Sequence, residues 1–220
     1  MKRYFPLVIF ALISGCSSPD PQITPQLLNV YITSAAYPLV GELYNCAPTS
    51  VAINLSDPHS ADVTIRLGSS DNLATPAFQF STEDILVIAN PQTGVTFLSL
   101  DQVRSIFLGQ IMDWKEVGGN DLAVQVWSLS PDEDVQSIFN RDVMNGQPIS
   151  SLARLAVSGE SMVEAIGSNS GSVGILPRRL INKTVQSVFN VESVPVLIIT
   201  KDTPAGSLNE LISCLQQENH

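Results

Sequence analysis

Short β-type apolar runs alternate with helix-type segments along almost the whole chain, and this alternation restricts the fold more than any other feature. The strand-type runs are residues 28–32, 50–55, 62–67, 85–89, 123–127, 153–157, 172–176 and 194–199. The helix-type segments are residues 35–44, 100–108, 131–144, 160–168 and 208–217. Strands that alternate with helices are typical of layered α/β folds with largely parallel pairing. We therefore expect an α/β protein.

The amino terminus has the pattern of an export signal. Lys2 and Arg3 precede an apolar stretch, residues 6–13, that is too short to span a bilayer. The stretch ends in Leu12-Ile13-Ser14-Gly15-Cys16, which resembles the lipobox cut by lipoprotein signal peptidase. The resemblance implies that residues 1–16 are a signal peptide and that Cys16 receives lipid. We expect an exported lipoprotein on the extracytoplasmic side, at the cell membrane or in the periplasm.

Residues 17–26 are polar and rich in proline, and we expect them to form a flexible tether between the lipid and the fold. Loss of Lys2 and Arg3 with the signal leaves nine basic residues (11 − 2) against 21 acidic ones, a formal charge of −12. Nucleic acids and anionic lipid faces bind clustered Lys and Arg, so neither is expected as a partner of this surface. The membrane contact is expected through the lipid anchor alone.

Two cysteines remain after Cys16. Cys46 closes the first helix-type segment and Cys214 lies in the last one. Outside the cytoplasm an even pair can form a disulfide, which here would join the two ends of the fold. Two separate buried thiols are the alternative, because a free cysteine behaves as a small apolar side chain.

Several helix starts carry a serine in a capping pattern. Ser99 and Ser130 each precede a glutamine or glutamate three residues later, as in a capping box. Ser34 and Ser158 can cap the helices that follow them. Such strand-to-helix turns gather at the carboxyl ends of strands in open α/β sheets, where ligands usually bind.

One stretch of the chain resembles a known family. It runs from Leu98 to Trp114, contains Ile106-Phe107-Leu108-Gly109, and is followed by Gly118-Gly119. A helix that ends in Ile-Phe-x-Gly, then a tryptophan, then a Gly-Gly turn resembles the phosphate-binding-protein-like extracellular solute receptors. Ser172-Val173-Gly174-Ile175-Leu176 resembles a later strand of the same family, and residues 194–200 resemble its return strand.

The resemblance implies a two-lobed periplasmic-binding-protein-like fold of type II, in which each lobe is a small sheet flanked by helices. On that basis lobe I comprises residues 27–91 plus 177–220, and lobe II comprises residues 92–176. The family's receptors close like a hinge on a small solute and present it to an ABC permease. We expect a monomer with these two partners and without a cofactor.

The family's first two ligand loops can be placed on this chain. The first falls on Thr33, Ser34 and Ala35, where a hydroxyl and helix amides would suit an anion. The second falls on Ser69, Ser70 and Asp71. The resemblance therefore predicts that these residues contact the ligand.

The third loop departs from the family pattern. Leu129 stands at the family's arginine, and Glu133-Asp134-Val135 stand at its Ser-Gly-Thr triplet. Because two unit charges about 4 Å apart interact by about 4 kcal/mol at an effective dielectric near 20, carboxylates here oppose a bound dianion. We interpret Asp132, Glu133 and Asp134 as local stabilisers of a helix start. The remaining candidate ligand contacts are Trp127, Ser128, Ser130, Ser158 and Gly159.

Catalytic and metal-binding patterns are absent from the sequence. His59 lies in a polar turn and His220 is the last residue, so no His/Asp/Ser triad or two-histidine metal motif is formed. We predict a lipid-anchored solute-binding protein, not an enzyme, whose ligand is something other than phosphate. The alternative is a degenerate receptor fold that acts as a non-transport surface lipoprotein.

Overall fold

A computed structural model describes residues 25–69 and 74–218. The expected lipidation site Cys16, the tether before residue 25, and Ser70 and Asp71 of the second loop lie outside the described residues. None of the described helices is both long enough and apolar enough to cross a membrane.

The described elements alternate between strands and helices along the chain. The strands are β1 (Gln26–Ile32), β2 (Val51–Leu55), β3 (Val63–Leu67), β4 (Ala77–Ala89), β5 (Gln125–Ser128), β6 (Arg154–Leu155), β7 (Ser172–Pro177) and β8 (Gln186–Thr200). The helices are α1 (Val40–Cys46), α2 (Leu100–Phe107), α3 (Asp134–Asp142), α4 (Gly159–Ser168) and α5 (Ser207–Glu218), and the 3-10 turns are η1 (Tyr37–Leu39), η2 (Pro91–Thr93), η3 (Trp114–Val117) and η4 (Arg178–Leu180). The α/β class predicted from the sequence is confirmed.

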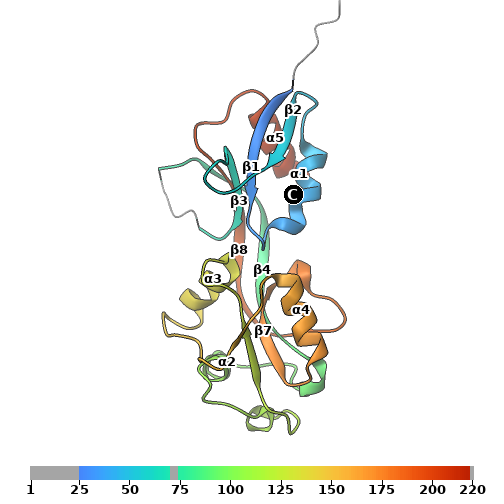
Figure 1. The fold of residues 1–220 in the computed structure, drawn as a ribbon, viewed down its shortest axis with the longest axis vertical. Coiled ribbons are helices and arrows are strands. Elements are labelled where there is room, and N and C mark those ends of the chain that lie inside the picture. Colours follow the sequence, from blue (N-terminus) through green and yellow to red (C-terminus); the bar gives the residue numbers. More distant parts are fainter. Residues whose placement is uncertain (1–24, 70–73, 219–220) are drawn as a thin grey trace, which may run out of the picture.

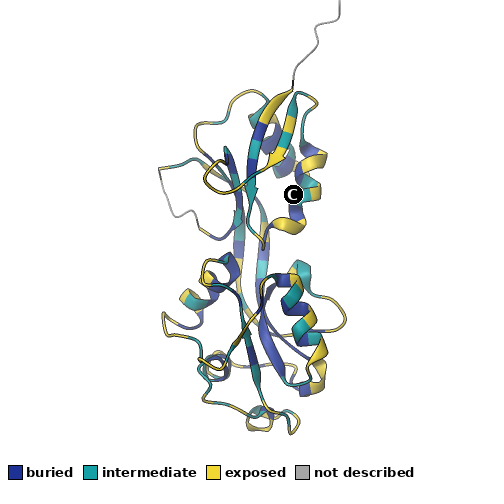
Figure 2. Cartoon of the chain, viewed as in Figure 1, coloured by how far each residue is buried: buried dark blue, intermediate teal, exposed yellow. Residues whose placement is uncertain are grey.

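The elements form two lobes joined by two long strands (Figure 1). The first lobe contains β1, β2, β3, α1 and α5, and the second contains β5, β6, β7, α2, α3 and α4. Strands β4 and β8 run through both lobes, so one sheet has the order β2-β1-β3-β8-β4-β7-β5-β6. Strand β4 is buried from Ile85 to Ala89, in the second lobe, and β8 is mostly buried from Val194 to Thr200, in the first, while the outer faces of the helices are exposed (Figure 2).

The expectation of largely parallel pairing is correct only at the two ends of the sheet. Strands β1, β2 and β3 pair in parallel in the first lobe, and β5 pairs in parallel with β6 and β7 in the second. At the centre, β8 pairs antiparallel with β3 and β4, and β4 pairs antiparallel with β7. The reason is that β4 carries the chain into the second lobe and β8 carries it back.

The residue bounds expected for the lobes remain a prediction. Strand β4 pairs with β8 along its whole length, and in the second lobe it also pairs with β7, Ile85 with Pro177 to Ala89 with Val173. After β7, a Cβ at Gly159 of α4 would lie 2.4 Å from Leu180, and one at Gly167 would lie 2.6 Å from Thr184. The chain just after residue 177 therefore still packs on the second lobe before β8 returns to the first.

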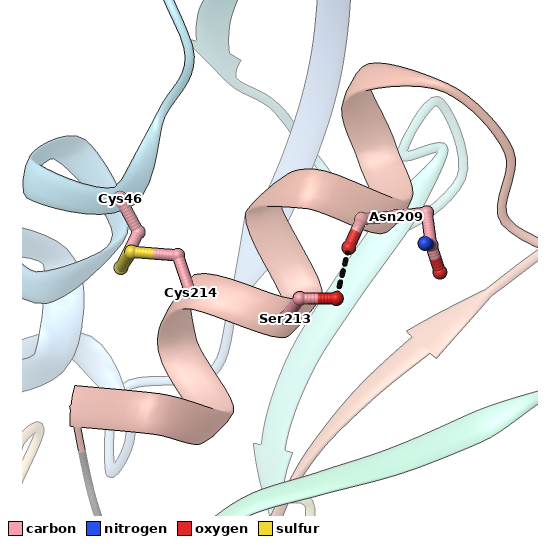
Figure 3. Close-up of a disulfide and its surroundings, with 4 residues drawn as sticks. All are labelled: Cys46, Asn209, Ser213 and Cys214. Carbon is pink, nitrogen blue, oxygen red and sulfur yellow. Dashed lines mark hydrogen bonds between the residues drawn. A yellow bond between two sulfur atoms is a disulfide. The ribbon is translucent and has the colours of Figure 1, made fainter.

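A disulfide joins the ends of the first lobe. Cys46 at the end of α1 is bonded to Cys214 of α5, with a Cα–Cα distance of 5.6 Å and a sequence separation of 168 (Figure 3). The side chains meet because α1 and α5 lie against each other on one side of β1 (Figure 1). Of the two alternatives open at the sequence level, the structure contains the disulfide.

Two of the four predicted serine caps are present in the structure. Ser99 and Gln102 form a capping box at α2, and Ser158 accepts from the Ser161 N–H at 3.2 Å at the start of α4. These two predictions are confirmed. The predictions for Ser34 and Ser130 are wrong, because η1 is capped by Ala36 without a side-chain bond and α3 begins only at Asp134.

Candidate functional site

The carboxylate of Asp134 lies where the two lobes meet. Asp134 is the first residue of α3, in the second lobe, and is only 3% exposed. Its Oδ2 accepts from the Thr33 hydroxyl at 2.7 Å and from the Leu67 N–H at 2.9 Å. Its Oδ1 lies 3.0 Å from Nη2 of Arg66. Three donors of the first lobe thus converge on one carboxylate of the second.

The strand register brings these donors together. Thr33 directly follows β1, and Arg66 and Leu67 end β3. The two strands pair in parallel, with Ile32 opposite Ile65, so their carboxyl ends lie at the same edge of the sheet. The Thr33 N–H donates to the Ile65 carbonyl at 3.0 Å, which fixes the loop that carries the hydroxyl. Gly68 then turns the chain with a φ of +83°, a conformation that glycine adopts without strain.

A second contact of the same kind lies beside the first. The Ser34 hydroxyl, again from the first lobe, donates to the Glu133 carboxylate. Glu133 is the N-cap residue of α3, yet its side chain makes no capping hydrogen bond. The interpretation of Glu133 and Asp134 as purely local stabilisers of a helix start is therefore wrong. Their side chains are oriented by donors about a hundred residues earlier in the chain.

A polar pocket of about 450 Å³ opens next to these contacts. The first lobe lines it with Tyr31, Thr33, Pro58, Thr64 and Arg66, and the second with Pro131, Asp132, Asp134 and Ser137. Burial, followed by the negative charges of Glu133 and Asp134, raises the pKa of Tyr31, while Arg66 acts in the opposite direction. The raised pKa of Tyr31 thus reflects burial first and the negative potential of the two carboxylates second. The pocket offers hydroxyls and carboxylates, and its one lining cation faces the Asp134 carboxylate.

The second lobe holds two other candidate ligand residues away from this pocket. The Trp127 indole N–H donates to the Ser172 hydroxyl at 3.2 Å, and the Arg154 guanidinium lies 5.6 Å from the indole ring centre. Trp127 lines a pocket of about 370 Å³ against α4. Ser128 lines a different pocket, of about 530 Å³, together with Leu129. The structure therefore does not bring Trp127 and Ser128 to Thr33.

Three of the other five predicted contact residues have structural partners of their own. Ser158 caps α4, and Gly159 is buried against Leu180. The Ser130 carbonyl accepts from the Glu133 N–H at 3.0 Å. Ala35 is buried, whereas Ser69 is exposed just after β3. A ligand role for any of these residues remains a prediction.

The sequence reading missed Arg66. Its signal was present, because Arg66 is the one charged residue in the run Val63-Thr64-Ile65-Arg66-Leu67. Charged residues are seldom buried unless they are paired, so an arginine inside a strand predicts a nearby carboxylate. Leu129, which the resemblance places at the family's arginine, is buried, and its N–H donates to Gln136 at 2.8 Å.

The strands that join the lobes carry a second set of charge pairs. Arg178 Nε lies 2.8 Å from Asp84 Oδ2, and the Ser193 hydroxyl also donates to Asp84. The Arg179 guanidinium pairs with the buried carboxylate of Glu83, which also accepts from the Arg179 N–H at 3.1 Å. Arg178 is thus an exposed charge, whereas Arg179 is a partly buried partner of the joining strand β4.

Metal ligation has little support among residues 25–69 and 74–218. The group of close potential ligands found there consists of Cys46, Cys214 and Glu218. Because the two sulfurs are bonded to each other, they are not available as thiolates.

Comparison with known proteins assigns most of the chain to one family. Residues 74–211 match the family model of the PBP superfamily domain. The phosphate-binding protein PstS of Bacillus subtilis (strain 168) is 22% identical over 117 residues, which are 53% of this chain and 38% of that protein. The match therefore spans well under half the length of this curated relative.

Solved structures share the fold over most of the chain. A putative phosphate ABC transporter substrate-binding protein with bound phosphate from Clostridium perfringens has a TM-score of 0.77 at 16% identity, covering 86% of this chain and 93% of that one. An ABC-type phosphate transport receptor from Vibrio cholerae has a TM-score of 0.66 at 18% identity, with the same coverage. The reduced regulatory domain of OxyR2 from Vibrio vulnificus also matches, with a TM-score of 0.65 at 10% identity over 88% of this chain and 95% of that one. The fold is therefore shared by receptors and by regulatory domains, and the two-lobed α/β class is confirmed.

Proposed function

Because the chain belongs to the PBP superfamily, we propose that it is a lipid-anchored extracytoplasmic solute-binding protein, not an enzyme, that works with an ABC permease and takes a solute other than phosphate. The similarity to phosphate transport receptors supports the receptor part of this proposal. The departure from phosphate rests on the site itself.

The position of the Asp134 carboxylate is the observation that supports a solute other than phosphate. Thr33, Arg66 and the Leu67 N–H are the donors that a small oxyanion would need, and each already bonds Asp134. A dianion entering here would meet Asp134 and Glu133 at close range, and their charges repel it. The solute that suits the adjoining pocket is polar and carries no net negative charge.

A ligand screen tests this proposal. The protein is heated with phosphate, sulfate, sugars, amino acids or small organic cations, because a ligand that binds only the folded state raises the melting temperature. We expect a shift with a neutral, zwitterionic or cationic solute and none with phosphate. A clear shift with phosphate would contradict the proposed solute class.

The lipid anchor is supported by the lipobox-like sequence that ends at Cys16. Its test is metabolic labelling with a radioactive fatty acid in cells that express the full chain or its Cys16→Ser variant. We expect label in the membrane fraction for the wild type and no label for Cys16→Ser. Equal labelling of both would contradict lipidation at Cys16.

One observation also favours the second candidate, a non-transport surface lipoprotein. The first-lobe groups that a solute would contact, Thr33 and Arg66, are already paired with the buried carboxylate of Asp134 from the second lobe. On this alternative no solute shifts the melting temperature, and cross-linking on intact cells captures a surface or assembly protein instead of a permease. A solute that raises the melting temperature and cross-links to a permease would exclude it.

A further inference from the structure

We infer that Asp134 is an intramolecular ligand: its carboxylate occupies an oxyanion site built by Thr33, Arg66 and the Leu67 N–H, and it thereby latches the two lobes together. This inference goes beyond the proposed function, because it holds whether the protein carries a solute or only a partner. The Asp134 carboxylate of the second lobe lies where a free carboxylate or a similar oxyanion would bind to the first lobe.

The geometry is that of a bound anion. Both carboxylate oxygens are engaged, Oδ2 by a hydroxyl and a backbone N–H at 2.7 and 2.9 Å, and Oδ1 by a guanidinium at 3.0 Å. Hydrogen bonds to charged groups are shorter and stronger than neutral ones. All three donors belong to β3 or to the loop after β1, whereas the carboxylate belongs to α3. The site is therefore formed by one lobe and filled by the other.

Burial explains why this contact acts as a latch. The side chain of Asp134 is 2% exposed and that of Arg66 is 22% exposed. A buried carboxylate needs its donors, because a charge left in an apolar surrounding without them is strongly unfavourable. Separation of the lobes breaks all three contacts together, and the neighbouring Ser34–Glu133 contact as well. These contacts are made by groups of the chain itself, so they stabilise the arrangement in which the two lobes touch.

Chemical rescue of an Asp134→Ala variant tests the latch. The substitution removes the carboxylate but leaves the three donors and a space that fits formate. We use the full-length protein in detergent and follow hydrogen exchange of the Leu67 amide by mass spectrometry of peptides that contain it. Loss of a charge-assisted hydrogen bond predicts exchange about 10- to 100-fold faster than in the wild type. Formate is expected to restore slow exchange and to raise the melting temperature of the variant.

Asp132→Ala is the matched control. Asp132 lies in the same segment and carries the same charge, but it is exposed. We expect Asp132→Ala and the wild type to exchange slowly at Leu67 and not to respond to formate. Equal responses of wild type and Asp134→Ala to formate, or no response of Asp134→Ala, would overturn the latch.

A second variant covers the case in which Asp134→Ala does not fold with or without formate. Asp134→Asn keeps the size of the side chain but removes its charge, so the Leu67 amide should exchange faster and formate should find no space. Unchanged exchange in Asp134→Asn would overturn the inference. Phosphate binding by the wild type would contradict the proposed solute class but would leave the rescue result intact, so the two failures are distinguishable.

Discussion

The contact between the lobes and the strands that join them use the same chemistry at different places. Between the lobes, Arg66 of β3 meets Asp134 of α3, across a sequence distance of 68 residues. Along the joining strands, Arg179 of η4 meets Glu83 of β4. In both pairs the carboxylate is almost fully buried, at 2% and 4% side-chain exposure, and the guanidinium is at 22% and 24%.

The difference between the two pairs lies in what each one holds. Strands β4 and β7 are already hydrogen-bonded from Ile85 to Ala89, so the Arg179–Glu83 pair adds to a connection that the sheet provides anyway. By contrast, β3 and α3 are not joined by strand pairing. Their contact depends on the Asp134 side chain, the side chains of Thr33 and Arg66, and the Leu67 N–H. We therefore expect loss of the Arg66–Asp134 pair to affect both stability and the contact between the lobes, and loss of the Arg179–Glu83 pair to affect stability alone.

The largest expected effect is on stability alone. Replacement of Cys46 and Cys214 by serine removes a cross-link that spans 168 residues, which costs about 5 kcal/mol of unfolding free energy in the chain-entropy description. Denaturant unfolding measures it. Because the Leu67 N–H donates to Asp134 and neither cysteine takes part in that contact, Leu67 exchange should stay slow under native conditions.

Ser213→Ala is the control for the cysteine pair. Its hydroxyl donates to the Asn209 carbonyl in the same helix, one turn before the disulfide (Figure 3). We expect Ser213→Ala to lower the unfolding free energy by less than about 1 kcal/mol. A loss as large as that of the cysteine variant would indicate damage to α5 instead of loss of the cross-link.

Arg66→Leu breaks the contact between the lobes. It leaves the buried Asp134 carboxylate without its cation, and removal of one partner of a buried pair costs about 3–5 kcal/mol. We also expect faster exchange at the Leu67 amide. Arg154→Ala removes the same charge from an exposed site near Trp127 and should cost only about 0.5–1 kcal/mol. Equal losses of unfolding free energy in the two variants would mean that the effect comes from the change in net charge and not from the contact with Asp134.

Glu83→Gln breaks the pair on the joining strands. The carboxylate loses its charge-assisted bonds to Arg179, and the expected loss of unfolding free energy is about 2 kcal/mol. Leu67 exchange should remain slow, because the strand pairing of β4 is intact. Fast exchange at Leu67 in this variant would abolish the distinction between the two regions.

Asp84 gives the joining strands a pH dependence. The Ser193 hydroxyl, and then Arg178, hold the pKa of Asp84 below its ordinary value of 3.8. A lowered folded-state pKa stabilises the protein above pH 3.8, and this contribution is lost as the pH falls through the folded pKa. Unfolding free energies of wild type and Asp84→Asn should therefore converge in acid. A constant difference across that range would contradict the assignment.

The smallest expected effect is a change in the pKa of Tyr31, which lies in the same pocket as Asp134 and is followed by absorbance. Burial and then Glu133 and Asp134 raise the pKa of Tyr31 above 10.0, so its stabilising contribution is lost as the pH rises from 10.0 through the folded value. Glu133→Gln should lower the Tyr31 pKa, although burial still keeps it raised. The tyrosinate absorbance, with Tyr31→Phe subtracted, reports it. An unchanged pKa would mean that Glu133 does not act on Tyr31.

Much of the fold could be predicted from local patterns. The cap at Ser99 depends on Gln102, three residues away, and the cap at Ser158 depends on Ser161, so both were visible in the sequence. The pattern at Ser130 was equally good, yet Glu133 bonds Ser34 instead. A donor from the other lobe competed with the helix amides, and a local pattern holds no information about such a donor.

The sequence by itself determined the alternation of strands and helices, whereas the export-type amino terminus and the loss of the family's arginine at Leu129 stay predictions. It did not determine that an arginine of β3 would meet Asp134. Only the tertiary structure decided this, because the parallel pairing of β1 and β3 places Thr33 and Arg66 at one sheet edge, and the passage of β4 and β8 between the lobes brings α3 against that edge. The donors and the carboxylate become neighbours through backbone pairing elsewhere in the sheet.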